Sequence, residues 1–414
     1  MKPYAELTKE ELESLKAQLK AEYKEYQAKG LSLNMARGKP CTEQLDLSMG
    51  MMDVLGGGED LTCEDGTDCR NYGVLDGIKE AKELIGDMME NPIDSIIIYG
   101  NSSLNVMYDT ISRSMTHGVM GSTPWCRLDK VKFLCPVPGY DRHFAITQYF
   151  GIEMINVPMT PTGPDMDLVE QLAASDEAVK GIWCVPKYSN PQGISYSDET
   201  VRRFARLKPA AKDFRIYWDN AYGVHHLYDH DQDHLIEILA ECKRAGNPDL
   251  VYKFASTSKI SFPGSGLAAI ATSPNNMEDI KAQLAIQTIG HDKVNQLRHV
   301  RFFGNIHGMI EHMRLHADIL RPKFEMVINT LESELGGLGI GTWTSPKGGY
   351  FISFDSLDGC AKQIVAKAKK AGVVMTGAGA TYPSPEDLHT AMKIFTLCVK
   401  LVSIDKLLKP APEA

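Results

Sequence analysis

The chain lacks the features that would mark a membrane protein or a nucleic-acid-binding protein. No stretch approaches the ~18 consecutive apolar residues of a membrane-spanning helix. The formal net charge is −9, whereas a nucleic-acid-binding surface is usually basic. We therefore expect neither a membrane nor a nucleic acid among its partners, although an acidic protein can still contain a local basic pocket.

Cysteine motifs and a secretory signal are lacking as well. The nine cysteines are odd in number and scattered, and Cys63 and Cys69 are spaced like neither a redox CxxC pair nor a zinc-ligand pair. Residues 1–30 are rich in Glu and Lys and contain no apolar core of a signal peptide. These absences predict reduced thiols and a cytoplasmic location.

Length and hydrophobic pattern predict an α/β protein with two or three domains. With 414 residues, of which 43% are apolar and 23% charged, the chain can bury a large core. Between residues 95 and 275, short apolar runs alternate with helical patterns, which is typical of a mostly parallel sheet. The predicted strands are residues 96–99, 131–135, 181–185, 215–218, 251–255 and 267–272.

The flanking regions contain helical patterns and a smaller α+β region. Thr8 and Glu11 form a capping-box pattern at the start of a helix that ends at Gly30. Residues 292–335 are predicted to be helical with a break near Pro322, because proline disrupts the backbone hydrogen bonding of a helix. Near the C-terminus the sequence predicts a strand at residues 349–354 and a helix at residues 361–370.

A lysine among hydroxyl residues follows the predicted strand at residues 251–255. The segment reads Ser256-Thr257-Ser258-Lys259, and ligands of α/β proteins bind at the ends of such strands. The lysine amine can form a Schiff base with a carbonyl compound while the hydroxyls bind a phosphate. The segment alone is also compatible with a solvated Ser/Lys loop.

Two further polar segments follow neighbouring predicted strands. Asp219 ends the strand at residues 215–218 and precedes Tyr222, so its carboxylate is either a helix N-cap or a functional acid. Asn190 begins Asn-Pro-Gln-Gly, which is either a simple turn or a ligand-binding amide. Because Asn190, Asp219 and Lys259 each follow a separate strand, we expect them to converge on one edge of the sheet.

Together these segments resemble the class I aminotransferases of fold type I, which use pyridoxal 5′-phosphate (PLP). The resemblance covers about residues 30–382 and is most specific for a bacterial aspartate-aminotransferase subgroup. It rests also on Ala36-Arg37-Gly38-Lys39-Pro40, Asn71-Tyr72-Gly73-x-Leu75-Asp76-Gly77, Gly139-Tyr140-Asp141-Arg142-His143-Phe144 and Asp292-Lys293-Val294-Asn295-Gln296-Leu297-Arg298-His299.

The resemblance implies a fold and a set of partners. A large domain, residues 46–300, would contain a mostly parallel seven-stranded sheet, and residues 1–45 and 301–414 would form a small α+β domain. The substrates would be an amino acid and a 2-oxo acid such as 2-oxoglutarate. The protein would be a homodimer with shared active sites, because Tyr72 falls where a tyrosine reaches the phosphate of the partner's cofactor.

The resemblance also implies roles for matching residues. Lys259 would carry PLP as a Schiff base and move the substrate proton, Asp219 would pair with the pyridine nitrogen, and Asn190 and Tyr222 would bind the ring oxygen. Tyr140 would stack on the ring, unless it is only a core residue. The phosphate would contact Asn101, Ser102, Ser103, Ser256 and Ser258, of which Ser102 could be only an N-cap. The substrate-binding residues would be Gly38, Asn190, Lys293 and Lys393.

Two positions depart from the pattern of this family. Many relatives place a phosphate-binding arginine eight residues after the lysine, where this chain has Leu267. The family also binds the substrate α-carboxylate through an arginine of its C-terminal domain, but no arginine follows Arg321. Lys393 is the candidate replacement, because Lys393-Ile394 aligns with an Arg-Ile pair that follows residues 379–383; the alternative is a surface residue. Arg37 is either a site residue or a surface charge.

Other activities are compatible with the same resemblance. A C–S β-lyase would use the same cofactor without a 2-oxo acid, and the fold alone does not choose between these reactions. A non-catalytic PLP-binding regulator would need an N-terminal DNA-binding domain, of which residues 1–30 show no pattern. His225, His226, His230 and His234 are spaced like no metal site, so we expect no metal.

Overall fold

The computed structural model describes residues 2–35, 38–375 and 385–409. The chain divides into two compact units. We call residues 42–189 and 194–316 the large unit, and residues 1–41, 190–193 and 317–414 the small unit. The predicted domain limits at residues 45 and 300 stay a prediction.

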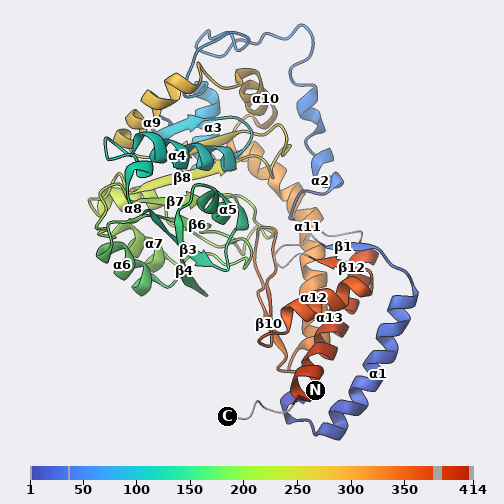
Figure 1. Ribbon diagram of the computed structural model, residues 1–414. Coiled ribbons are helices and arrows are strands. Elements are labelled where there is room, and N and C mark those ends of the chain that lie inside the picture. Colours follow the sequence, from blue (N-terminus) through green and yellow to red (C-terminus); the bar gives the residue numbers. More distant parts are fainter. Residues whose placement is uncertain (1, 36–37, 376–384, 410–414) are drawn as a thin grey trace. The chain divides into compact units, whose positions relative to one another are not determined.

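The large unit is built on a sheet in the order β2-β9-β8-β7-β6-β3-β4-β5 (Figure 1). The pairs among β8, β7, β6, β3 and β4 are parallel, whereas β9 runs antiparallel to β2 and β8, and β5 antiparallel to β4. The strands are β2 (Ile96–Ile98), β3 (Lys132–Val137), β4 (Glu153–Thr160), β5 (Gly163–Pro164), β6 (Val179–Cys184), β7 (Arg215–Asp219), β8 (Val251–Ser256) and β9 (Ala268–Ala271).

Helices cover both faces of this sheet because its strands are apolar on both faces. Phe133, Trp183 and Tyr217 pack on one side with residues of α4 (Ser103–His117) and α9 (Pro274–Gln287). Leu134, Ile182 and Trp218 pack on the other side with α6 (Met166–Ser175), α7 (Asp198–Ala205) and α8 (Ile238–Arg244). The remaining helices of the unit are α2 (Thr42–Asp46), α3 (Lys79–Met89), α5 (Asp141–Tyr149) and α10 (Lys293–Phe303). The predicted mostly parallel α/β fold is confirmed, but the predicted number of seven strands is wrong: the sheet has eight, because the two-residue strand β5 adds to its edge beside β4.

Two features of the large unit differ from the prediction. The edge strands β4 and β5 were not predicted, and the break in the helical stretch of residues 292–335 lies elsewhere. Strand β4 is half-exposed and mixes polar residues with apolar ones, so it shows no apolar run. The expected break near Pro322 is wrong: α11 (Ile306–Leu335) passes through Pro322, and the interruption lies at Gly304. Gly304 ends α10 with φ +70°, a conformation that glycine adopts without strain.

The small unit contains its own core and two short sheets. Strand β1 (Leu33–Met35) pairs in parallel with β12 (Val373–Met375), and β10 (Gly341–Trp343) pairs antiparallel with β11 (Phe354–Ser356). Helices α1 (Lys9–Ala28), α12 (Ala361–Lys370) and α13 (Pro385–Leu407) surround them. Thr8 and Glu11 form the predicted capping box, with Glu11 N donating to Thr8 Oγ1 at 3.2 Å. The strand expected at residues 349–354 is wrong except at its last residue.

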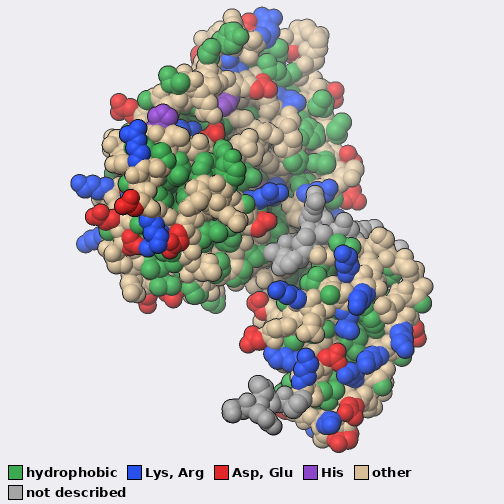
Figure 2. All heavy atoms as spheres, viewed as in Figure 1, with side chains coloured by type: hydrophobic (Ala, Val, Ile, Leu, Met, Phe, Trp, Pro, Cys, Tyr) green, Lys and Arg blue, Asp and Glu red, His purple; other side chains and the backbone are tan. Residues whose placement is uncertain are grey.

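Surface features agree with an ordinary globular chain. In Figure 2 basic and acidic side chains are interspersed on the face in view of each unit. None of the helices in the described part of the chain has the length and hydropathy that a bilayer span requires.

Candidate active site

The carboxyl ends of two neighbouring parallel strands bring the predicted residues together. Asp219 is the last residue of β7, and Lys259 lies three residues beyond the end of β8, with which β7 pairs in parallel. Burial lowers the pKa of Lys259, and Asp219 is close enough for its charge to oppose part of that shift. The predicted convergence of Asp219 and Lys259 is therefore seen within the large unit.

Asp219 is buried, and only one of its oxygens has a partner. His143 Nε2 lies 3.0 Å from Asp219 Oδ2, whereas Oδ1 has no hydrogen-bond partner in the described chain although it is buried. His143 stacks on Trp183 with ring centroids 4.6 Å apart and an interplanar angle of 14°. A buried acceptor without a donor is costly, so Oδ1 is suited to an N–H donor supplied by a ligand.

Lys259 lies beside an aromatic ring in a low-dielectric environment. Its Nζ is 4.9 Å from the ring centroid of Tyr222, a residue that is itself buried. Burial lowers the pKa of Lys259, and the charge of Asp219 opposes this shift. The amine is therefore neutral, and nucleophilic, at lower pH than that of a solvated lysine.

The ring of Tyr140 lies next to the same carboxylate. Tyr140 precedes α5 and packs edge-on against His143, with centroids 4.9 Å apart and an angle of 80°. Burial first, and the charge of Asp219 second, raise the pKa of Tyr140 to about 12. Tyr140 is only partly buried, so it is not the core residue that the alternative described.

Hydroxyl and amide groups gather at the start of α4. Ser258 Oγ donates to Asn101 O at 2.8 Å, and Asn101 Nδ2 donates to Pro263 O at 3.3 Å. Ser102 stands at the N-cap position, but its side chain makes no capping hydrogen bond. Ser103 begins the helix, whose first N–H groups favour an anion. Ser256 ends β8 and is partly buried.

A partly buried arginine, Arg298, contacts the loop in which Leu267 stands in place of the family arginine. Leu267 is buried, and a side chain on Gly266 would come within 3.0 Å of Thr257 Oγ1 and 3.2 Å of Ser258 N. Arg298 Nη2 donates to Ser265 O at 3.2 Å, and its Nε is buried without a partner in the described chain. In the sequence Arg298 stands out only as part of a motif, and nothing there indicates its contact with this loop.

Lys293, the first residue of α10, binds the loop of the large unit that contains Tyr72. Tyr72 is 82% exposed, whereas Lys293 is buried. Lys293 Nζ donates to Asn71 O at 2.6 Å and to Gly73 O at 3.0 Å. The ammonium therefore fixes the backbone on both sides of Tyr72, and its predicted contact with substrate stays a prediction.

The other predicted residues belong to the small unit. Asn190 lies in the segment 190–193 and is partly buried. Gly38 packs against Phe351, whose ring would lie 2.7 Å from an added Cβ, so a side chain does not fit there. Lys393 is exposed on α13, the surface position that the alternative described, and its role in the site stays a prediction. Arg37 and residues 379–383 lie outside the described residues.

The histidines of residues 225–234 do not gather around one point. His225 is buried and His226 accepts or donates at 2.7 Å to the hydroxyl of Tyr188, whereas His230 and His234 are exposed. Within the described ranges, no group of three His, Cys, Asp or Glu residues is arranged to hold a metal ion.

Sequence reasoning missed the support that fixes Asp219. Thr147 Oγ1 donates to His143 O at 2.9 Å and accepts from Trp183 Nε1 at 2.8 Å. This network holds the imidazole against the carboxylate through groups on α5 and β6. His143 and Thr147 lie four residues apart on one helix face, which is a signal, but it does not say which strand that face meets.

Comparison with known proteins agrees with this geometry. A model of the aspartate amino-transferase family matches residues 7–406. The aspartate aminotransferase of Corynebacterium glutamicum is 44% identical over 370 residues, which cover 89% of this chain and 85% of that protein. A crystal structure of an aspartate transaminase from the same species has a TM-score of 0.94 at 40% identity, covering 97% of this chain and 99% of that chain. The α-aminoadipate aminotransferase of Thermus thermophilus, complexed with N-(5′-phosphopyridoxyl)-L-leucine, has a TM-score of 0.68 at 17% identity over 90% of this chain and 92% of that chain, which shows the fold alone.

Proposed function

Because the chain belongs to the aspartate aminotransferase family, we propose that it moves the amino group of L-aspartate to a 2-oxo acid such as 2-oxoglutarate. It is an aminotransferase, and aminotransferases of this fold use PLP. One observation carries the assignment of the site: Asp219, with one buried oxygen unpartnered, ends the strand beside the one that leads to Lys259.

The residues at this end of the sheet fit the cofactor. Asp219 Oδ1 is a buried acceptor suited to a protonated pyridine nitrogen, and Tyr140 presents a partly buried ring next to it. Tyr222 and Asn190 are the proposed donors to the ring oxygen. When bound, PLP supplies an electron sink that stabilises the carbanion formed at the substrate Cα.

Lys259 is the proposed base and acid at the substrate Cα. Its amine would hold the cofactor and, once the substrate has replaced it there, would be free to accept the proton from the substrate Cα. A pKa lowered by burial favours the neutral amine that must accept this proton. His143 holds Asp219 in place through a bond that water cannot reach, because both side chains are buried.

The phosphate is proposed to bind where α4 begins. Helix N–H groups and the hydroxyls of Ser102, Ser103, Ser256 and Ser258 supply donors, with Asn101 joining the two loops. Many relatives have a phosphate-binding arginine at the position of Leu267. In this chain Arg298, which binds the same loop at Ser265, is the proposed source of the positive charge near the phosphate. We therefore expect Arg298→Met to weaken PLP affinity, measured by release of the cofactor, with the fold retained by circular dichroism.

A second copy of the chain is the proposed partner. Tyr72 is exposed, and Met49, Met52, Ile286 and Ile289 of the same unit are exposed apolar side chains. Hybrid dimers test whether the sites are shared. If Tyr72 serves the partner's Lys259, mixing Lys259→Ala with Tyr72→Ala subunits restores one native site per hybrid; without sharing, no native site forms and activity does not rise.

The reaction itself is tested by half-reactions. The PLP form is mixed separately with L-aspartate, L-glutamate, L-alanine and L-phenylalanine, and the loss of the cofactor's visible absorbance is followed. We expect fast conversion by the acidic amino acids and its reversal by a 2-oxo acid. L-Cystathionine, which has a sulfur leaving group on Cβ, is tested in the same way, and its conversion to ammonia and pyruvate without a 2-oxo acid, with no conversion by the acidic amino acids, would identify a β-lyase and overturn the proposal.

A further inference from the structure

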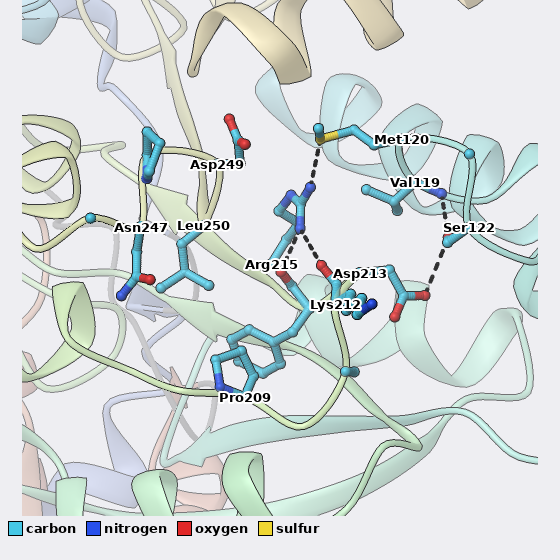
Figure 3. Close-up of a pocket in the computed structure, with 15 residues that line it drawn as sticks. Val119, Met120, Ser122, Pro209, Lys212, Asp213, Arg215, Asn247, Asp249 and Leu250 are labelled. Atoms are coloured by element: carbon cyan, nitrogen blue, oxygen red, sulfur yellow. Dashed lines mark hydrogen bonds between the residues drawn. The ribbon is translucent and has the colours of Figure 1, made fainter.

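A cavity of about 570 Å³ opens at the end of the sheet opposite Lys259 (Figure 3). It is lined by residues within 119–122, 209–215 and 246–250, which precede β7 and β8 or follow α4. Its volume lies within the range of small-molecule sites, about 300–1,000 Å³. None of the residues assigned to the catalytic chemistry lines it.

Arg215 brings to this cavity a buried positive charge that has no ion pair in the described chain, although its guanidinium lies 5.7 Å from the ring centroid of Tyr252. The residue is 3% exposed, and its guanidinium donates only to uncharged acceptors: Asn276 Oδ1 at 3.1 and 3.0 Å, Phe214 O at 2.8 Å, Lys212 O at 3.4 Å and Met120 Sδ at 3.0 Å. No carboxylate of the described chain forms an ion pair with it. The buried cation Lys180, by contrast, lies 2.7 Å from Asp213.

The acidic residues of the cavity wall are already bound elsewhere. Asp213 accepts from Lys180 and from Trp125 Nε1 at 2.8 Å. Asp249 accepts from Ser273 and Asn275 at the start of α9, where the helix N-terminus favours a negative charge. Burying a charge without a counter-charge is unfavourable, so Arg215 is expected to have an anionic ligand.

Met120 occupies the position that such a ligand would take. A thioether is a weak acceptor, and the Met120 side chain is 41% exposed, so it can leave Arg215 without opening the core. Its backbone has φ +49°, an uncommon conformation for a residue other than glycine, and its N–H donates to Asp279 Oδ2 at 3.1 Å. Figure 3 shows the contact between this sulfur and the guanidinium at the edge of the cavity.

We propose that this cavity is a second ligand site, which binds a small organic acid through an oxyanion placed on Arg215. The carboxylate or phosphate group displaces Met120 Sδ and converts a weak contact into a charge-assisted hydrogen bond. Lys212, exposed on the same wall, adds a second positive charge at the rim. The site is independent of the proposed aminotransferase reaction, since no catalytic residue takes part in it.

The test follows the methyl group of Met120 directly. The PLP-loaded protein, labelled with [¹³C]methyl-methionine, is titrated with succinate and separately with inorganic phosphate. The Met120 signal is identified by its loss in Met120→Ala, and the cofactor absorbance reports binding at the catalytic end in the same samples. We expect a saturable shift of the Met120 signal, and the two titrations distinguish a carboxylate site from a phosphate site.

Three variants complete the test. Arg215→Met should weaken binding at least about tenfold, because a charge-assisted hydrogen bond is lost. Met120→Ala should tighten binding several-fold in calorimetry, and Lys212→Ala should weaken it and reduce its salt dependence. If Arg215→Met does not fold, the proposal is tested by the other two variants, because Met120→Ala should strengthen anion binding and Lys212→Ala should weaken it. A Met120 signal that neither anion moves, or binding unchanged in Met120→Ala and Lys212→Ala, would overturn the proposal.

Discussion

The two ends of strand β7 carry opposite charges in different surroundings. Arg215 begins the strand and Asp219 ends it, and both are buried. Asp219 is surrounded by groups that can transfer protons or stack on a ring, namely His143, Lys259 and Tyr140. Arg215 is surrounded by carbonyls, an amide, a thioether and the ring of Tyr252. The contrast teaches that a buried charged group with an unpartnered or weakly bound atom is a candidate ligand site, and that its neighbours indicate whether the ligand reacts.

The largest expected effect comes from removing the amine at the catalytic end. Lys259→Ala should lower kcat by about 10⁴-fold or more, because both cofactor attachment and proton transfer are lost. Borohydride reduction and peptide mapping should place the cofactor on Lys259 in the parent. Lys187→Ala is the matched control, since burial lowers the pKa of Lys187 to about 8 without placing it in the reaction. Labelling at Lys187 would reverse the assignment.

Substitutions of two aspartates, one near each end of β7, should distinguish a catalytic role from a structural one. Asp219→Asn should lower kcat on the order of 10²-fold, because the pyridine nitrogen loses its negative partner. Asp213→Asn should leave kcat within a few-fold but destabilise the fold by about 3 kcal/mol or more, because Lys180 becomes a buried unpaired charge. Steady-state kinetics and urea unfolding measure the two effects, and equal kinetic losses would remove the contrast.

Lowering the pH should reduce folding stability first near the carboxyl ends of the sheet strands, where Lys259 lies, and only later near the opposite ends, where Arg215 lies. Burial lowers the pKa of His299 to about 4, and its Nε2 lies 3.1 Å from Thr257 Oγ1 and 3.0 Å from Ser261 Oγ. The unfolded state therefore binds more protons between about pH 6.5 and 4, so stability falls as pH falls through this window, by up to about 3 kcal/mol.

Urea unfolding from pH 7.5 to 4.5 measures that slope, and hydrogen exchange at residues 257–261 and at β7 locates it. His299→Gln should flatten the slope, whereas His230→Gln, which changes an exposed histidine, should not. Identical slopes in both variants would show that another group causes the acid sensitivity.

The smallest expected effect concerns Lys393. If it binds the α-carboxylate, Lys393→Ala should raise KM for aspartate several-fold and Lys393→Arg should restore it, because arginine offers two parallel donors. If Lys393 is only a surface residue of α13, both variants should match the parent. Lys362→Ala, in α12, is the control for a general change in surface charge.

The central sheet was predictable because its buried strands produce a strong local pattern, and the proximity of Asp219 and Lys259 follows from the strands that precede them. The buried strands β6, β7 and β8 consist mainly of apolar residues, and β7 and β8 end at the polar residues Asp219 and Ser256. Strand β4 is partly exposed and contains Pro158, so its pattern is not that of a buried strand. The helix break failed for a different reason: a glycine with positive φ ended α10, while α11 tolerated a proline.

Contacts between distant segments were not predictable. The bond from His143 to Asp219 joins residues 76 apart, and that from Arg298 to Ser265 joins residues 33 apart. Such pairs depend on how helices lie on the sheet, which hydrophobic periodicity does not encode. Arg215 could be read only as the first residue of a strand, because its missing counter-charge becomes visible only in three dimensions.

The antiparallel strand β9 has a consequence for the entropy of the lysine loop. Ser256 of β8 pairs with Ala268 of β9, so the loop from residue 257 to 267 starts and ends at adjacent points of one sheet. Thr257 N donates to Leu267 O, and Leu267 N donates to Thr257 Oγ1, both at 2.8 Å. The backbone freedom of this loop is therefore lost when the sheet folds, and ligand binding need not order it again.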